Sequence, residues 1–308
     1  MSDQAQKLRA KVNENKLSNL IDDIKNIKDI QEIYSRAVLQ SNNKCKVLSL
    51  ISAKGGVGKT LCLYSIVEIL KSYNKRVAII DMNKYYSDIS LYYRNPNIVN
   101  ITKKNILENV SFSLLEIENI EQYIYQLTPE IQSVEWQLIK IILYQAKLSE
   151  FEYVVIDTPV SSPDILFNIS TIVDKTIIVS NVTFNSLYNT NNLLQRIIKM
   201  LDNKIIIDLI FNNIDKADNS LIMQFIESVG KSEKIEINEI LKIKNDKILK
   251  VLEELGVTAA LHSEKIKSSE MYEHLKKYIE TEILDISSAS ASQKAQKNVL
   301  KNFLNFFK

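Results

Sequence analysis

Three of the five glycines in this 308-residue chain lie within four positions of one another, at Gly55, Gly56 and Gly58, and Lys59 and Thr60 follow them. Glycine permits a tight turn that leaves backbone N–H groups directed at a ligand, so the cluster predicts a loop that surrounds an anion. A lysine and a threonine at the end of such a loop are the groups that bind nucleotide phosphates and the accompanying Mg²⁺. The spacing therefore predicts a nucleotide site; the simpler alternative is an ordinary glycine turn.

The elements on either side of this loop agree with that prediction. Residues 46–52 form an apolar run typical of a buried strand, and residues 61–73 carry apolar side chains at helical spacing. The positive end of the helix would then face the phosphates. Ala53 stands where the first glycine of the usual loop lies. The predicted nucleotide-binding residues of the loop are Lys54, Gly55, Gly56, Val57, Gly58, Lys59, Thr60 and Leu61.

Two further strands are predicted to end in a carboxylate. Residues 76–81 form one apolar run that ends in Asp81, and residues 151–157 form another that ends in Asp157. An aspartate at the carboxyl edge of a parallel sheet can hold Mg²⁺ through its water shell. We therefore expect Thr60 and Asp157 to be the metal-binding residues.

The seven residues from Lys54 onward resemble the deviant Walker A loop of the MinD/ParA family of ATPases. The resemblance implies ATP and Mg²⁺ as cofactors. It also implies an ATP-dependent homodimer, in which Lys54 reaches the phosphates bound to the partner subunit. Catalytic roles for Lys54, Lys59 and Asp81 follow from the same resemblance.

Two positions outside the loop are interpreted through this family. Its members usually carry a second acid two residues after Asp81, where this chain has Asn83. An amide cannot take a proton from water, so we expect slow hydrolysis or none, unless Asp88 substitutes for the missing acid. Asn212 matches an asparagine that contacts the adenine edge in the family, and a plain turn residue is the alternative.

Strands and helices alternate along the core of the chain. Residues 175–180 and 204–213 predict strands, with a helix over 185–200 between them. This alternation predicts an α/β fold with a doubly wound, mostly parallel sheet and helices on both of its faces. The signal is weaker between residues 97 and 150, where we expect a helix over 117–127.

Composition limits the classes of partner. The formal net charge is only +2, so nucleic-acid binding would need a local basic patch and is not expected. Cys45 and Cys62 lack the spacing of a metal site or a disulfide, which fits a reducing cytoplasm. No run of residues approaches the roughly 18 apolar residues of a membrane span, and no secretory signal is recognised.

Residues 1–43 lie outside the predicted core and form a helical arm. Its longer helix, over 17–39, carries an apolar stripe that could pack on the chain's own core or dock a partner. Five residues near the start match the Asp-Gln-Ala-x-x-Leu-Arg element of FlhG-type proteins, which are MinD-like regulators of flagellar number: Asp3, Gln4, Ala5, Leu8 and Arg9. The resemblance implies a short helix that docks on the GTPase FlhF and stimulates its GTP hydrolysis.

The carboxyl-terminal segments complete the domain prediction: an ATPase domain over 44–286, a linker over 287–296 and an amphipathic helix over 297–308. At about 100° per residue, the apolar side chains of this helix fall on one arc. Such a helix suits an anionic membrane surface, and it resembles the membrane-targeting helix of MinD and FlhG; packing back on the core is the alternative. The predicted membrane-contacting residues are Val299, Leu300, Phe303, Leu304, Phe306 and Phe307.

The motifs and their order predict a cytoplasmic ATPase of the FlhG type. It would dimerise on ATP, bind reversibly to the inner face of the cell membrane and stimulate an FlhF-type GTPase. Three alternatives remain from the sequence: a ParA-type ATPase for DNA partition, a MinD-type regulator of division-site placement, and a scaffold that binds ATP without hydrolysing it.

Overall fold

The computed structural model describes residues 26–83, 87–113, 120–131, 136–160, 163–214, 219–245 and 263–284. The predicted partner-docking element at residues 3–9, the linker and the amphipathic helix lie outside the described residues, and their assignments stay predictions. Within the described ranges, no helix is both long enough and apolar enough to cross a bilayer.

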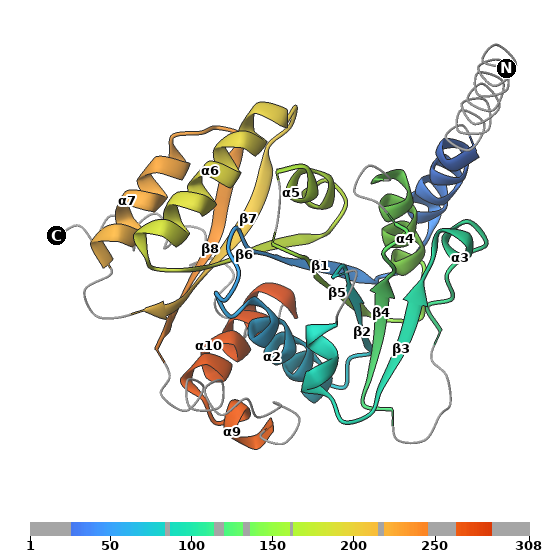
Figure 1. The fold of residues 1–308 in the computed structure, drawn as a ribbon, viewed down its shortest axis with the longest axis horizontal. Helices are drawn as coiled ribbons and strands as arrows, with labels where there is room; N and C mark the ends of the chain where they lie inside the picture. The colour runs from blue at the N-terminus through green and yellow to red at the C-terminus, as the bar shows by residue number, and fades with distance from the viewer. Residues whose placement is uncertain are drawn as a thin grey trace, which may run out of the picture.

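A parallel sheet organises the described part of the chain, with eight strands in the order β3-β4-β2-β5-β1-β6-β7-β8 (Figure 1). Every neighbouring pair is parallel, which confirms the predicted doubly wound α/β fold. The strands are β1 (Lys46–Ile51), β2 (Val77–Asp81), β3 (Pro96–Ile101), β4 (Gln122–Leu127), β5 (Tyr153–Asp157), β6 (Lys175–Asn181), β7 (Ile205–Ile214) and β8 (Ile235–Lys244).

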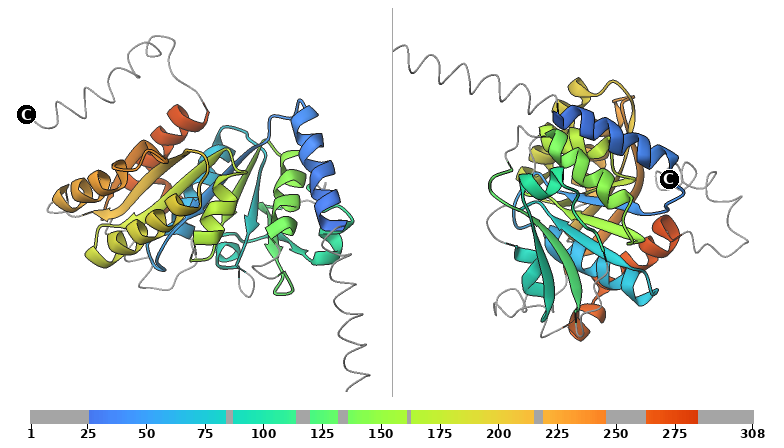
Figure 2. Two further views of the ribbon diagram at one scale, coloured as in Figure 1. Left: turned by 90° about the horizontal axis from the view of Figure 1, so that it is seen from above. Right: turned by 90° about the vertical axis from the view of Figure 1, so that its right-hand side faces the viewer.

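Helices cover both faces of this sheet (Figures 1 and 2). They are α2 (Lys59–Ser72), α3 (Lys103–Leu107), α4 (Trp136–Lys147), α5 (Pro163–Ser170), α6 (Phe184–Met200), α7 (Asn219–Gly230), α9 (Ser263–Lys267) and α10 (Glu270–Tyr278), with the short helices η1 (Asp88–Tyr92) and η3 (Ile279–Ile283). One buried cluster packs α4, α5, α6 and α7 against the sheet, and the other packs α2, η1, α10 and η3.

The central strands show why the sequence folds in this way. Every residue of β2 and β5 is buried, and so are all residues of β1 after the first. Such continuous apolar runs need a cover on both faces, which a parallel sheet with crossover helices supplies. The carboxyl ends of β1, β2 and β5 therefore meet at one edge of the sheet.

The predicted helix over residues 117–127 is wrong, because residues 122–127 form strand β4 between β2 and β3. Ile124 packs with the core on the α2 side of the sheet, and Tyr125 packs on the opposite side. The Tyr125 ring lies 4.2 Å from that of Phe112, measured between centroids. Apolar residues on both faces of a short strand cannot be told from a buried helix by spacing alone.

The arm before β1 is helical over residues 26–40. Ile27 is buried in the core cluster on the α4 side, and Ile30 and Tyr34 pack against the same cluster. The outer face exposes Ile33 by 65% and Leu39 by 85%. The described part of the predicted stripe thus packs on the chain's own core, and two large apolar side chains remain exposed.

Candidate nucleotide-binding site

The glycine loop joins β1 to α2, with Gly56 and Gly58 at φ values of +72° and +84°. These left-handed conformations favour glycine, since a Cβ atom would clash with the following carbonyl oxygen. Gly58 is the N-cap of α2, and a glycine has no side chain that could accept a hydrogen bond from the first N–H groups of the helix. Lys54, Gly55 and Gly56 are exposed. The loop therefore presents backbone donors and the positive end of α2 to one open site.

Lys59 and Thr60 begin α2 and meet Asp157 at the end of β5. The Lys59 ammonium forms an ion pair with Asp157 Oδ1, and the Thr60 hydroxyl lies 3.5 Å from Oδ2. Asp157 is fully buried, and this burial raises the pKa of its carboxyl, while the charge of Lys59 opposes the shift. The structure thus brings together the predicted phosphate-binding lysine and both predicted metal-binding residues.

Asp81 lies beside Asp157, because the two residues are register partners in β2 and β5. Asp81 is fully buried, and its Oδ1 accepts hydrogen bonds from the backbone N–H of Asn83 at 2.9 Å and from its side-chain amide at 2.8 Å. No described residue donates to Oδ2. Burial raises the pKa of Asp81 to about 6; hydrogen bonds to the carboxyl oppose this shift, and the charge of Asp157 adds a smaller increase.

These groups fit a magnesium ion. Mg²⁺ takes oxygen ligands, usually one or two carboxylates together with waters and substrate phosphates. Asp157 and Thr60 supply a carboxylate and a hydroxyl, and Asp81 Oδ2 is a buried acceptor without a donor among the described residues. A cation at this edge would compensate two adjacent buried carboxylates, of which Asp157 is paired with Lys59 and Asp81 has no ion pair among the described residues.

A family model described as "NUBPL iron-transfer P-loop NTPase", of the ParA group, matches residues 43–279. The chain belongs to the ParA family of P-loop NTPases. A comparison with the curated proteins gave no match.

Solved structures of ParA-family and MinD proteins share the fold. The MinC:MinD cell division complex of Aquifex aeolicus matches with a TM-score of 0.55 and 20% identity, over 77% of this chain and 96% of that one. Septum site-determining MinD of Pyrococcus horikoshii, complexed with Mg-ADP, gives 0.52 and 17%, over 80% and 99%. A putative plasmid partition protein of Borrelia burgdorferi, bound to AMPPNP, gives 0.54 and 23%, over 78% and 100%.

The ParA-family loop in this chain has its extra lysine at the surface. Within the described ranges, Lys54 is exposed and its side chain makes no hydrogen bond or ion pair. A lysine that served its own loop would be expected to turn inward, as Lys59 does toward Asp157. Lys54 is therefore available to a group from outside the subunit.

Asn83 stands where family members carry the second acid, and its side-chain amide faces the first acid, Asp81. The Asn83 side chain donates to Asp81, and the backbone carbonyl of Asn83 accepts a hydrogen bond from the Gln126 side-chain amide at 3.2 Å. Asp88, which the sequence offered as a substitute, begins η1 and is exposed. Its charge also raises the pKa of Asp157, after the larger effects of burial and Lys59. The carboxylate of Asp88, which lies outside the predicted motif, therefore affects the pKa of a carboxyl at this edge of the sheet.

Asn212 lies at the carboxyl end of β7, within reach of the loop. Its side-chain amide donates to the carbonyl of Val57 at 3.0 Å. The predicted base-side residue is thus brought to the phosphate loop.

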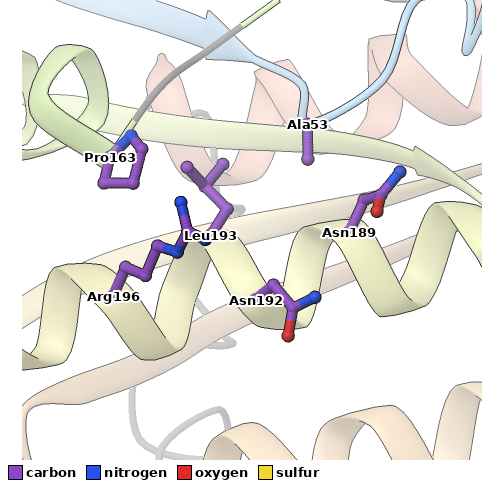
Figure 3. A pocket seen from close by; sticks show the side chains of 6 residues that line it. All are labelled: Ala53, Pro163, Asn189, Asn192, Leu193 and Arg196. Atoms are coloured by element: carbon purple, nitrogen blue, oxygen red, sulfur yellow. The ribbon is translucent and has the colours of Figure 1, made fainter.

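A second feature of this edge was not predicted from the sequence. A cavity of about 330 Å³ lies between Ala53 and the face of α6 (Figure 3). Asn189, Asn192 and Arg196 line it from α6, and Pro163 lines it from α5. The only signal in the sequence was the polar spacing along this helix, which is common on solvated faces. The cavity does not include Lys59 or Asp157, so it is separate from the phosphate site.

Proposed function

We propose that this ParA-family chain binds ATP with Mg²⁺ and that ATP joins two copies into a dimer. The arrangement of Lys59, Thr60 and Asp157 at the mouth of a left-handed glycine loop carries this proposal. The Mg-ADP and AMPPNP named for the P. horikoshii and B. burgdorferi structures support the choice of ligand.

Each residue of the site would have a separate role in binding ATP and Mg²⁺. Lys59 would leave its ion pair with Asp157 and neutralise the β- and γ-phosphates, while the loop N–H groups donate to the phosphate oxygens. Thr60 and Asp157 would then hold Mg²⁺. The bound ion would neutralise phosphate charge and orient the terminal phosphate. Asn83 keeps Asp81 oriented through two hydrogen bonds.

Sedimentation of the full chain with ATP and Mg²⁺ tests the dimer. The proposal expects dimers for the native chain and monomers for Lys54→Ala, because the exposed ammonium would reach the phosphates of the partner subunit. Lys231→Ala removes a lysine that is also exposed, in the segment after α7, and should leave the dimer intact. Single subunits for all three proteins would refute ATP-dependent dimerisation.

A measurement of ATP hydrolysis would distinguish a nucleotide-dependent switch from a scaffold that binds ATP without hydrolysing it. Asn83 favours a chain that holds ATP for a long time, because it offers no carboxylate to accept a proton from water. A phosphate-release assay in the presence of membranes would decide between slow turnover and none. Release indistinguishable from that of Lys59→Ala would favour the non-hydrolysing scaffold.

We further propose an FlhG-type role in flagellar assembly, which rests on the sequence at residues 3–9. Mixing the chain with purified FlhF should accelerate GTP hydrolysis, and Gln4→Ala should reduce that acceleration. Asn15→Ala changes a polar residue of the same arm outside the matched element and serves as the control. No acceleration by the native chain would favour a MinD-type role in division-site placement, which leaves this element unexplained.

Reversible membrane binding is proposed from the apolar arc of residues 299–307. One such helix binds weakly, and two helices on an ATP dimer bind together with a higher effective concentration. Deleting residues 299–308 should abolish ATP-dependent sedimentation with anionic liposomes and leave nucleotide binding unchanged. Equal sedimentation of the shortened chain would contradict this assignment.

Two other roles within the ParA family have less support. A DNA-partition role needs a basic surface on the dimer, and the chain carries a net charge of only +2. Binding to DNA that weakens with added salt would support this role. An iron-transfer role needs accessible cysteine ligands. Cys45 and Cys62, the two cysteines of the chain, are both buried, and burial raises the pKa of the Cys45 thiol to about 11.

A further inference from the structure

Asn212 reaches the phosphate loop from the far end of the chain. Its Nδ2 donates to the Val57 carbonyl at 3.0 Å, across 155 positions of sequence. Both residues are buried, Asn212 at 5% exposure and Val57 at 2%. A buried amide that satisfies a loop carbonyl fixes that carbonyl more firmly than water can, since breaking the bond would leave a buried acceptor unpaired.

The same side chain fills the space beside Gly58. A Cβ atom added at Gly58 would lie 2.3 Å from Asn212 Nδ2, far inside the limit of contact. Gly58 also requires its left-handed conformation at φ +84°. The two residues on either side of the same peptide unit, Val57 and Gly58, are therefore both in contact with one amide group.

The support behind Asn212 is rigid. The preceding residue in β7, Phe211, is almost completely buried and packs edge-on against Phe225 of α7 with ring centroids 5.8 Å apart. Asn212 is also the register partner of Asn181 in β6. The amide is thus held by the sheet, and the loop, which contains three glycines, is the softer of the two partners.

We propose that Asn212 is a positioning residue that holds the glycine loop in its phosphate-binding conformation through the Val57 carbonyl. The role of this contact in phosphate binding rests on the proposed nucleotide function. Its mechanical part, which is its effect on the conformation of the loop, does not.

Hydrogen exchange of the chain without ligand tests the mechanical part. Loop amides over residues 53–60 should exchange about tenfold faster in Asn212→Ala and Asn212→Asp, because loss of one buried hydrogen bond lowers the cost of local opening. The aspartate variant keeps the size of the side chain and removes the donor. Asn203→Ala changes an exposed asparagine just before β7 and should leave the loop unchanged. Unchanged loop exchange in both Asn212 variants, with native exchange in β4, would overturn the proposal.

Binding of inorganic tripolyphosphate tests the link to phosphate recognition. This probe lacks a base, so a residue that only contacted adenine would not affect it. The positioning role predicts that the uncharged variant Asn212→Ala weakens tripolyphosphate binding about tenfold, whereas native affinity in this variant would overturn that role. A native chain that binds neither ATP nor tripolyphosphate would refute the proposed nucleotide function, and the exchange result would still decide the loop contact.

Discussion

Replacing Asp81 by asparagine should stabilise the chain above pH 6. The carboxyl is fully buried, and its Oδ1 already accepts two hydrogen bonds from Asn83. An asparagine can keep both bonds through its own oxygen, and its uncharged amide takes the place of Oδ2 at a cost that does not vary with pH. The substitution therefore removes the buried charge with little change in shape.

The magnitude follows from the pKa of Asp81, which folding raises from 3.8 to about 6, mainly through burial; hydrogen bonds to the carboxyl oppose this shift, and the charge of Asp157 adds a smaller increase. Because each pKa unit corresponds to about 1.4 kcal/mol, ionisation of Asp81 costs the fold about 3 kcal/mol. The folded chain binds this proton more tightly than the unfolded chain does. The free energy of unfolding therefore falls as pH rises from about 4 to about 6, and it falls no further through this group above that range.

Urea unfolding of the native chain and of Asp81→Asn between pH 4 and pH 8 measures this effect. The stability difference in favour of the variant should grow by about 3 kcal/mol across the range, with most of the growth below pH 6. Asp202→Asn, at an exposed turn before β7, controls for the loss of one negative charge. A difference that stays constant with pH would refute the reasoning, because it would show that Asp81 is not held in a charge-opposing environment.

Three further outcomes follow from the same site and its core. Gly58→Ala should abolish measurable ATP binding by filter assay, because the added Cβ would meet the Asn212 amide and disfavour φ +84°; native affinity would contradict this geometry. Asn83→Asp should raise phosphate release by about 10²-fold by restoring an acid, and Asp88→Asn should lower the residual rate, so equal rates in all three proteins would exclude both residues from the hydrolytic step. Phe151→Ala should cost about 3–5 kcal/mol in urea unfolding, because the ring is 1% exposed and packs against Tyr123; a loss below about 1 kcal/mol would contradict its place in the core.

The structure also limits where the arm can interact. The inner stripe of residues 26–40 is already packed on the core, so a partner could use only the outer face with Ile33 and Leu39, or residues before 26. Core packing therefore accounts for the inner face of the described part of this helix, and partner docking stays a prediction.

The sequence alone determined the loop, the helix after it and the two strands that end in Asp81 and Asp157. These features are local: glycine freedom, helical spacing and continuous apolar runs are properties of residues close together in the chain. The same reasoning found the alternation of elements and hence the parallel sheet, because consecutive parallel strands need a crossover between them.

Which of these features lie next to one another depends on the order of the strands in the sheet. Asp81 and Asp157 become neighbours because β2 pairs with β5 and not with β1, and spacing along the chain does not specify that order. Residues 122–127 became a strand because β2 and β3 offered backbone partners on both sides, which outweighed a spacing equally compatible with a helix. The Asn212 contact with Val57 likewise depends on bringing the end of β7 against the loop, a contact between residues too far apart in sequence for any local pattern to specify.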